Sequence, residues 1–207
     1  MSNIGSEYLL RRITELELVV DKLSLTEVDH PTVTVVVGFY GDVLLRTVVA
    51  AGGQASFDID SIPSGYDEIK IFLQGKSERT DAFSENILIS LNADTTNTNY
   101  YREFMYGLDA SATVTEAEDR FIGWLGSNQD AMYIGQIEVS IIHPSSPFQK
   151  TLRGQSSVRR AAAQQYVTSV SLSWENTAAI TRITLAPAGA YDFAEGTLCL
   201  IVGYKNH

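Results

Sequence analysis

From residue 32 onward, apolar residues recur at every second position along this chain, and this spacing constrains its fold more than any other feature. The clearest runs share one apolar and one more polar face, and they span residues 57–60, 69–73, 87–91, 137–141, 169–174, 182–185 and 198–204. A period of two is the pattern of a strand with one buried face. The alternation therefore predicts a mainly β body.

Turn signals separate these runs, as at Gly52-Gly53, Pro63-Ser64-Gly65 and Pro187-Ala188-Gly189. No helix-length periodic segment lies between consecutive strands, which argues against a parallel βαβ sheet. We expect a single helical turn or a loop at residues 157–165, where three alanines occur together. Many short strands within one domain predict an antiparallel, jelly-roll-like β-sandwich.

The N-terminal segment follows a different period. Residues 7–24 carry apolar side chains at alternating spacings of four and three, the a and d positions of a heptad seam. These residues are Leu9, Ile13, Leu16, Val20 and Leu23. Arg12 at g and Glu17 at the following e would pair across a parallel interface. The spacing predicts a short coiled-coil helix that oligomerises the chain.

Two alternatives stay open for this helix. A lone helix of about 18 residues is marginal in water and needs a partner, which is either another copy or the helix's own β domain. The a and d residues favour two strands, whereas Leu10 at e and Val19 at g widen the apolar face and favour three. We expect residues 1–30 to serve assembly or attachment and residues 31–207 to form the β-sandwich.

Charge and cysteine content exclude several classes. The formal net charge of −10 argues against nucleic acid as a partner, since phosphate binding requires a cationic surface. The single cysteine, Cys199, cannot form an intrachain disulfide and is expected to be a buried strand residue. No signal peptide or membrane-length apolar run is present in the sequence. We expect assembly in a reducing cytoplasm, without membrane insertion.

An oxygen-rich loop is a candidate ligand site. Asp94, Asn97 and Asn99 precede Tyr100 and Tyr101, and such side chains usually bond their own backbone in turns. The alternative is a bound Ca²⁺ or sugar hydroxyl, although the loop lacks the glycine and closing glutamate of an EF-hand. Nearby aromatic residues are expected either to stack on sugars or to pack in the core and subunit interfaces. They are Tyr100, Tyr101, Phe104, Tyr106 and Trp124.

A basic segment is a candidate partner site. Lys150, Arg153, Arg159 and Arg160 lie within residues 149–173, which contain no acidic residue. This asymmetry predicts either contact with an acidic neighbour or an ordinary solvated loop.

Catalytic signals are weak. Glu116, Glu118 and Asp119 would suit glycoside cleavage only at a defined separation across the scissile bond, and solvated acids are the ordinary interpretation. His30, His143 and His207 are far apart in the sequence, and no nucleotide-binding, hydrolase or zinc-protease motif is present. The sequence predicts neither an enzyme nor a cofactor or metal site; a carbohydrate-active enzyme on a jelly roll is the alternative from another class.

Three segments carry a resemblance to a known group. The segment 57–71, with Ile62-Pro63, Tyr66, Ile69 and Ile71, resembles a segment found in tailed-bacteriophage virion proteins. The loop 91–100 and the C-terminal run from Ile180 to Tyr204, with Phe193 and Gly196-Thr197, look like two further segments of the same group. The resemblance covers roughly residues 43–205, and the segment 32–42 departs from the group's short forms.

This resemblance implies a trimeric β-sandwich mounted on the phage particle as a tail-fibre, baseplate or head-decorating component. Our leading hypothesis is a tail-fibre or baseplate subunit, with a host-surface glycan as a candidate partner. A capsid decoration or head-fibre protein is the alternative location. Other virion proteins and further copies of the chain are the implied partners.

Deleting residues 1–28 tests the predicted coiled coil. If the heptad seam assembles the protein, the deletion variant is monomeric because the apolar contact between helices is lost. Light scattering measures the mass of both forms. An unchanged oligomer in the deletion variant would contradict the assignment.

Overall fold

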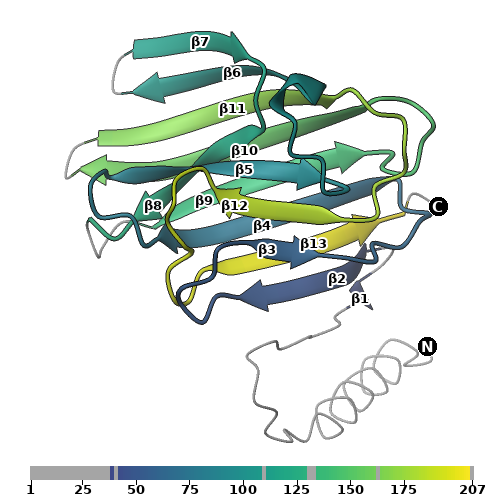
Figure 1. Ribbon diagram of the computed structural model, residues 1–207, viewed down its shortest axis with the longest axis horizontal. Coiled ribbons are helices and arrows are strands. Elements are labelled where there is room, and N and C mark those ends of the chain that lie inside the picture. The colour runs from purple at the N-terminus through teal and green to yellow at the C-terminus, as the bar shows by residue number, and fades with distance from the viewer. Residues whose placement is uncertain (1–37, 40–41, 109–110, 130–133, 162–163, 206–207) are drawn as a thin grey trace, which may run out of the picture. The chain divides into compact units, whose positions relative to one another are not determined.

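The computed structural model describes residues 38–39, 42–108, 111–129, 134–161 and 164–205 (Figure 1). The predicted coiled coil at residues 7–24 lies outside these ranges, and its assignment stays a prediction. Within the described residues the chain forms thirteen strands and one 3-10 turn, η1 (Asn97–Asn99).

The larger layer, sheet A, contains nine of the described strands, and every neighbouring pair in it is antiparallel. Across the sheet their order is β1 (Gly38–Phe39), β2 (Asp42–Val49), β13 (Leu198–Tyr204), β4 (Glu68–Ser77), β9 (Gly135–Ile142), β10 (Lys150–Ala161), β11 (Gln164–Trp174), β6 (Tyr100–Leu108) and β7 (Ser111–Ala117).

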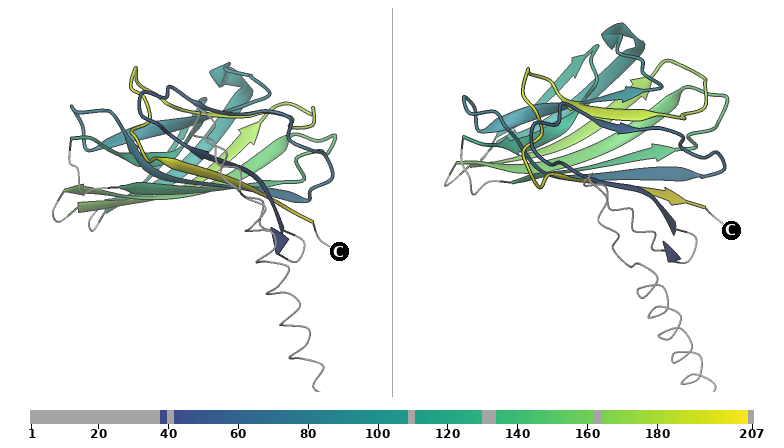
Figure 2. Two further views of the ribbon diagram at one scale, coloured as in Figure 1. Left: turned by 90° about the horizontal axis from the view of Figure 1, so that it is seen from below. Right: turned by 60° about the horizontal axis from the view of Figure 1, so that its bottom comes forward.

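The smaller layer, sheet B, is also antiparallel. Its order is β3 (Phe57–Ile59), β12 (Ile183–Pro187), β5 (Ser84–Leu91) and β8 (Phe121–Ser127). Sheet B stacks on one face of sheet A (Figure 2). The two layers join where the end of β4 pairs in parallel with β8, at Lys76–Gly126 and Ser77–Ser127. The predicted mainly β sandwich is therefore confirmed, with the parallel β4–β8 pairing as a departure from the expected antiparallel arrangement, whereas the jelly-roll-like topology stays a prediction.

The expectation for residues 157–165 is wrong. β10 continues to Ala161 and β11 begins at Gln164, so strands occupy most of this segment. The alternation persists there, because Val158 is buried while Arg159 is exposed. The alanine cluster suggested a helix, but the long β10–β11 ladder decides the local conformation.

Apolar side chains of the inner faces fill the space between the sheets. On sheet A, Ile69, Ile71 and Leu73 of β4 are at most 1% exposed, and the alternate residues point away from sheet B. On sheet B, Phe57 stacks on Phe193 with ring centroids 4.3 Å apart. Cys199 is buried in this core as expected, and burial raises the pKa of its thiol to about 12.

Two glycines allow β8 to pack directly against sheet A, because neither carries a side chain that would separate the strands. A Cβ atom added to Gly135 would lie 2.7 Å from the Gly126 nitrogen and 2.8 Å from the Leu125 Cα. A Cβ atom on Gly123 would lie 2.7 Å from the Ser156 Cβ. Atoms this close cannot coexist without moving a strand, so glycine at these positions sets the spacing of the layers.

Substituting Gly135→Ala tests this close approach. We expect a loss of about 1–3 kcal/mol in the free energy of unfolding, because the clash is with backbone rather than a flexible side chain. Gly107→Ala is the control, since its added Cβ would meet only the Ser111 carbonyl oxygen at 3.9 Å and should change stability by less than about 0.5 kcal/mol. Equal denaturation midpoints for the two variants would contradict the interpretation.

Candidate functional site

The outer face of sheet A, which points away from sheet B, is open to solvent across the described strands. The ladders align its side chains in rows perpendicular to the strands. The first row follows the pairs Phe72–Glu138, Glu138–Gln155, Gln155–Ser169 and Ser169–Met105. The second row follows Gln74–Gln136, Gln136–Ser157, Ser157–Val167 and Val167–Gly107.

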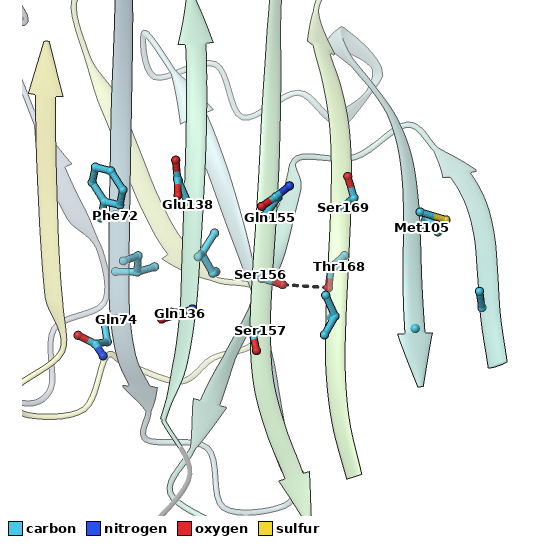
Figure 3. Close-up of a pocket in the computed structure, with 15 residues that line it drawn as sticks. Phe72, Gln74, Met105, Gln136, Glu138, Gln155, Ser156, Ser157, Thr168 and Ser169 are labelled. Atoms are coloured by element: carbon cyan, nitrogen blue, oxygen red, sulfur yellow. Dashed lines mark hydrogen bonds between the residues drawn. The ribbon is translucent and has the colours of Figure 1, made fainter. Parts of the chain in front are cut away.

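A groove of about 610 Å³ lies along these two rows. It reaches from β4 to β7, and the side chains of both rows line it (Figure 3). Small residues such as Ser157, Ser169 and Gly107 leave space between the larger Phe72 and Met105. Five interstrand steps separate β4 from β7, so the groove crosses about 24 Å of sheet at ~4.8 Å per step.

The polar groups of the groove have unused hydrogen-bonding capacity. The side-chain amides of Gln74, Gln136 and Gln155 have no hydrogen-bond partner among the described residues, and neither does the Ser169 hydroxyl. Other hydroxyls of the groove are engaged: the Ser157 Oγ accepts a 2.7 Å hydrogen bond from the Gln165 amide, and the Ser156 Oγ donates to the Thr168 Oγ1 at 2.9 Å. Each free amide offers both donors and an acceptor to a molecule in the groove.

Charge is sparse in this region. Glu138 is the one charged side chain among the described residues that line the groove. Arg153 lies in an adjoining hollow of about 510 Å³, which Glu138, Gln155 and Ser169 also border. Arg159 borders a further hollow of about 320 Å³, together with Gln74, Gln136 and Ser157. The groove and its two neighbouring hollows therefore have no excess of negative charge, although the whole chain carries a charge of −10.

The predicted basic residues do not act as one surface. Lys150 is 1% exposed and points into the sandwich, whereas Arg153 and Arg159 are exposed on the outer face of β10. The Lys150 ammonium donates to the carbonyl oxygens of Ser146 at 2.7 Å, Phe148 at 2.5 Å and Thr177 at 3.4 Å. Burial lowers its pKa.

For Lys150, all three ammonium protons are accounted for by these loop carbonyls. A partner role therefore stays a prediction for the exposed Arg153 and Arg159. The Arg160 side chain lies outside the described residues, and its partner role also stays a prediction.

In the predicted oxygen-rich loop, the carboxylate of Asp94 is turned toward the protein. Asp94 accepts hydrogen bonds from the Thr96 amide at 3.0 Å, the Asn99 side chain at 3.0 Å and the Trp174 indole at 2.9 Å. Burial alone would raise the Asp94 pKa, but these donors outweigh it and lower the pKa. Asn97 is exposed and accepts from Arg120 at 3.1 Å.

The two tyrosines of this loop lie in different environments. Tyr100 is fully buried; its hydroxyl donates to the Asp94 carbonyl oxygen and accepts from the Leu91 amide. Burial raises the Tyr100 pKa to about 12. Tyr101 is 42% exposed on the outer face and donates to Glu116. These contacts are those of a structural turn, and ligand binding at the loop stays a prediction.

The remaining aromatic candidates form a cluster on the inner face of β6. Phe104, Tyr106 and Trp124 contact one another, and Trp124 also packs on Tyr166 with ring centroids 4.7 Å apart. The Arg102 guanidinium lies 4.2 Å from the Phe104 ring centroid and bonds Asp119 at 2.7 Å. Asp119 is therefore engaged in an ion pair, while Glu116 bonds Tyr101.

Among the described residues, no group of three or more His, Cys, Asp or Glu side chains is arranged to hold a metal ion. In the same part of the chain, no helix has the length and apolar character that spanning a bilayer requires.

Comparison with known proteins shows a weak likeness to a solved structure. No family model and no curated protein matches the chain. A solved structure of the tripod (BppUct-A-L) from the baseplate of bacteriophage Tuc2009 is similar at 10% identity, covering 100% of this chain and 94% of that chain. Its TM-score is 0.22, too low to establish a common fold.

Sequence reasoning missed the groove. The available signal was the type of residue at outward positions of 135–142, 150–161 and 164–174, where Ser and Gln are more frequent than the Lys and Glu usual on solvated faces. The location of the groove depended on strand order, which the sequence pattern does not contain.

Lys150→Met tests the structural role of the buried ammonium. The substitution keeps an unbranched side chain but removes the donor from three carbonyls, and we expect a loss of about 1.5–3 kcal/mol in the free energy of unfolding. Arg153→Met, on the outer face of the same strand, should change it by less than about 0.5 kcal/mol. Urea denaturation measures both. A Lys150 variant as stable as the Arg153 variant would overturn the assignment.

Proposed function

We propose that this chain is a non-enzymatic structural protein of a tailed-bacteriophage virion, in a tail fibre or baseplate. In this proposal the segment 1–30 assembles a homotrimer and attaches it to other virion proteins. The β-sandwich projects from the particle and contacts the host surface. We also propose a jelly-roll-like topology for the sandwich.

The observation that carries the proposal is the outer face of sheet A, which none of the described residues covers. Sheet B packs on one face of sheet A, so the described core lies on one side of it. Exposed apolar side chains also occur on the outer face, with Val167 at 56%, Met105 at 50% and Val114 at 71%. An exposed apolar patch rimmed by polar groups commonly marks an interaction surface.

The sequence resemblance supplies the biological setting. The segments that resemble tailed-phage virion proteins fall on structurally important positions: Phe57 and Phe193 stack in the core, and Tyr100 and Asp94 fix the loop before β6. A rigid sandwich that offers a broad face to other molecules suits a protein whose work is mechanical attachment and binding. The same features suit a capsid decoration or head-fibre protein, which is the alternative location.

Electron microscopy of the phage that encodes this chain tests the proposal. We expect a gold label directed at a C-terminal affinity tag to mark purified particles, and a label on the tail tip would support the tail-fibre or baseplate assignment. A label on the head would instead support the decoration or head-fibre alternative. Absence of the protein from purified particles by mass spectrometry, with the tagged protein present in the lysate, would overturn the proposal.

A further inference from the structure

We infer that the groove across β4, β9, β10, β11, β6 and β7 binds a linear, uncharged oligosaccharide. The inference rests on the proposed virion role and names the ligand class of its binding face. It assigns recognition to this groove and not to the Asp94 loop, where the carboxylate already accepts three internal hydrogen bonds.

The groove matches sugar hydroxyls in its hydrogen-bonding groups. Gln74, Gln136 and Gln155 have amides without partners among the described residues, and each presents donors and an acceptor side by side. A hydroxyl likewise donates one hydrogen bond and accepts others. Amide and hydroxyl side chains of this kind fix the orientation of a small polar ligand.

The rows also suit a linear molecule. The first row places Glu138, Gln155 and Ser169 between two apolar side chains, Phe72 at one end and Met105 at the other (Figure 3). The apolar C–H faces of sugar rings can pack against such side chains, while the intervening polar groups bond the hydroxyls. The groove crosses about 24 Å of sheet, so a chain of several linked sugar rings fits along it.

Competing occupants fit less well. A peptide that adds a strand needs a free sheet edge, whereas this groove lies on a sheet face. A second protein copy would require a more apolar interface centre, and the middle of the groove is amide and hydroxyl. An acidic glycan would meet the Glu138 carboxylate within the groove, whereas Arg153 and Arg159 border only the adjoining hollows.

Oligosaccharide-array binding with purified full-length protein tests the inference, using an array that carries neutral and acidic linear glycans. We expect binding to neutral glycans. Gln136→Ala combined with Gln155→Ala should weaken the Kd of the best glycan at least tenfold, equivalent to ~1.4 kcal/mol. Ser169→Trp should abolish binding by filling the groove.

Gln149→Ala is the matched control, because Gln149 is exposed just before β10 and does not line the groove. It should leave both binding and the melting temperature unchanged. Thermal denaturation of all variants shows whether they fold, and Gln136→Ala with Gln155→Ala changes only solvent-facing positions.

Three results would overturn the inference: no glycan bound, acidic glycans bound in preference, or neutral glycans bound equally by the groove variants. Each is distinguishable from failure of the proposed function. If the protein is found on phage particles but binds no neutral glycan, the proposed ligand of the groove is wrong and the proposed virion role is unaffected. A protein that binds neutral glycan through the groove but is absent from particles refutes the virion role alone.

Discussion

The close approach of β8 to sheet A is the constraint on which the sandwich depends. Gly135 and Gly123 remove the side chains that would hold the layers apart, and the β4–β8 bridge joins the layers through the backbone. Beneath the groove, the Ser156 hydroxyl accepts from the Trp124 amide at 3.2 Å and donates to Thr168 at 2.9 Å. These hydrogen bonds link β8, β10 and β11 beneath the groove, and they fix the positions of the strands that carry it.

Buried polar groups fix one end of the sandwich. Cross-strand pairing aligns Lys150, Trp174 and Tyr100 in one row. The Lys150 ammonium binds carbonyls of two loops, and Asp94 bonds the Trp174 indole. Such groups are costly to bury unless every hydrogen bond is made. Here they tie loops that are distant in sequence to the ends of the same strands.

The two faces of sheet A have different roles because their residues differ. Inward positions carry Ile, Leu, Val and Trp, which exclude water between the layers. Outward positions on the central strands carry Ser, Gln and Glu, whose side chains are too small or too polar to require a cover. A hollow therefore persists on a face that exposes Met105 at the end of the groove and Val114 beside it. The proposed binding role follows from this asymmetry.

The sequence by itself determined the mainly β class, the sandwich and the burial of residues such as Ile71, Val139 and Cys199. These follow from a period of two, which is local information. The sequence also marked Asp94 as a turn residue, because its own loop supplies two of the three donors to its carboxylate, the Thr96 backbone amide and the Asn99 side chain.

Only the tertiary structure decided which strands are neighbours, and with that the groove. Phe72, Glu138, Gln155, Ser169 and Met105 come from five strands whose order in the sheet differs from their order in the chain. The tertiary structure also decides that the Lys150 side chain faces inward, while that of Arg153, three residues later, faces outward. Pairing between distant strands is set by the fit of whole faces and the spacing of layers, which no local pattern of residues encodes.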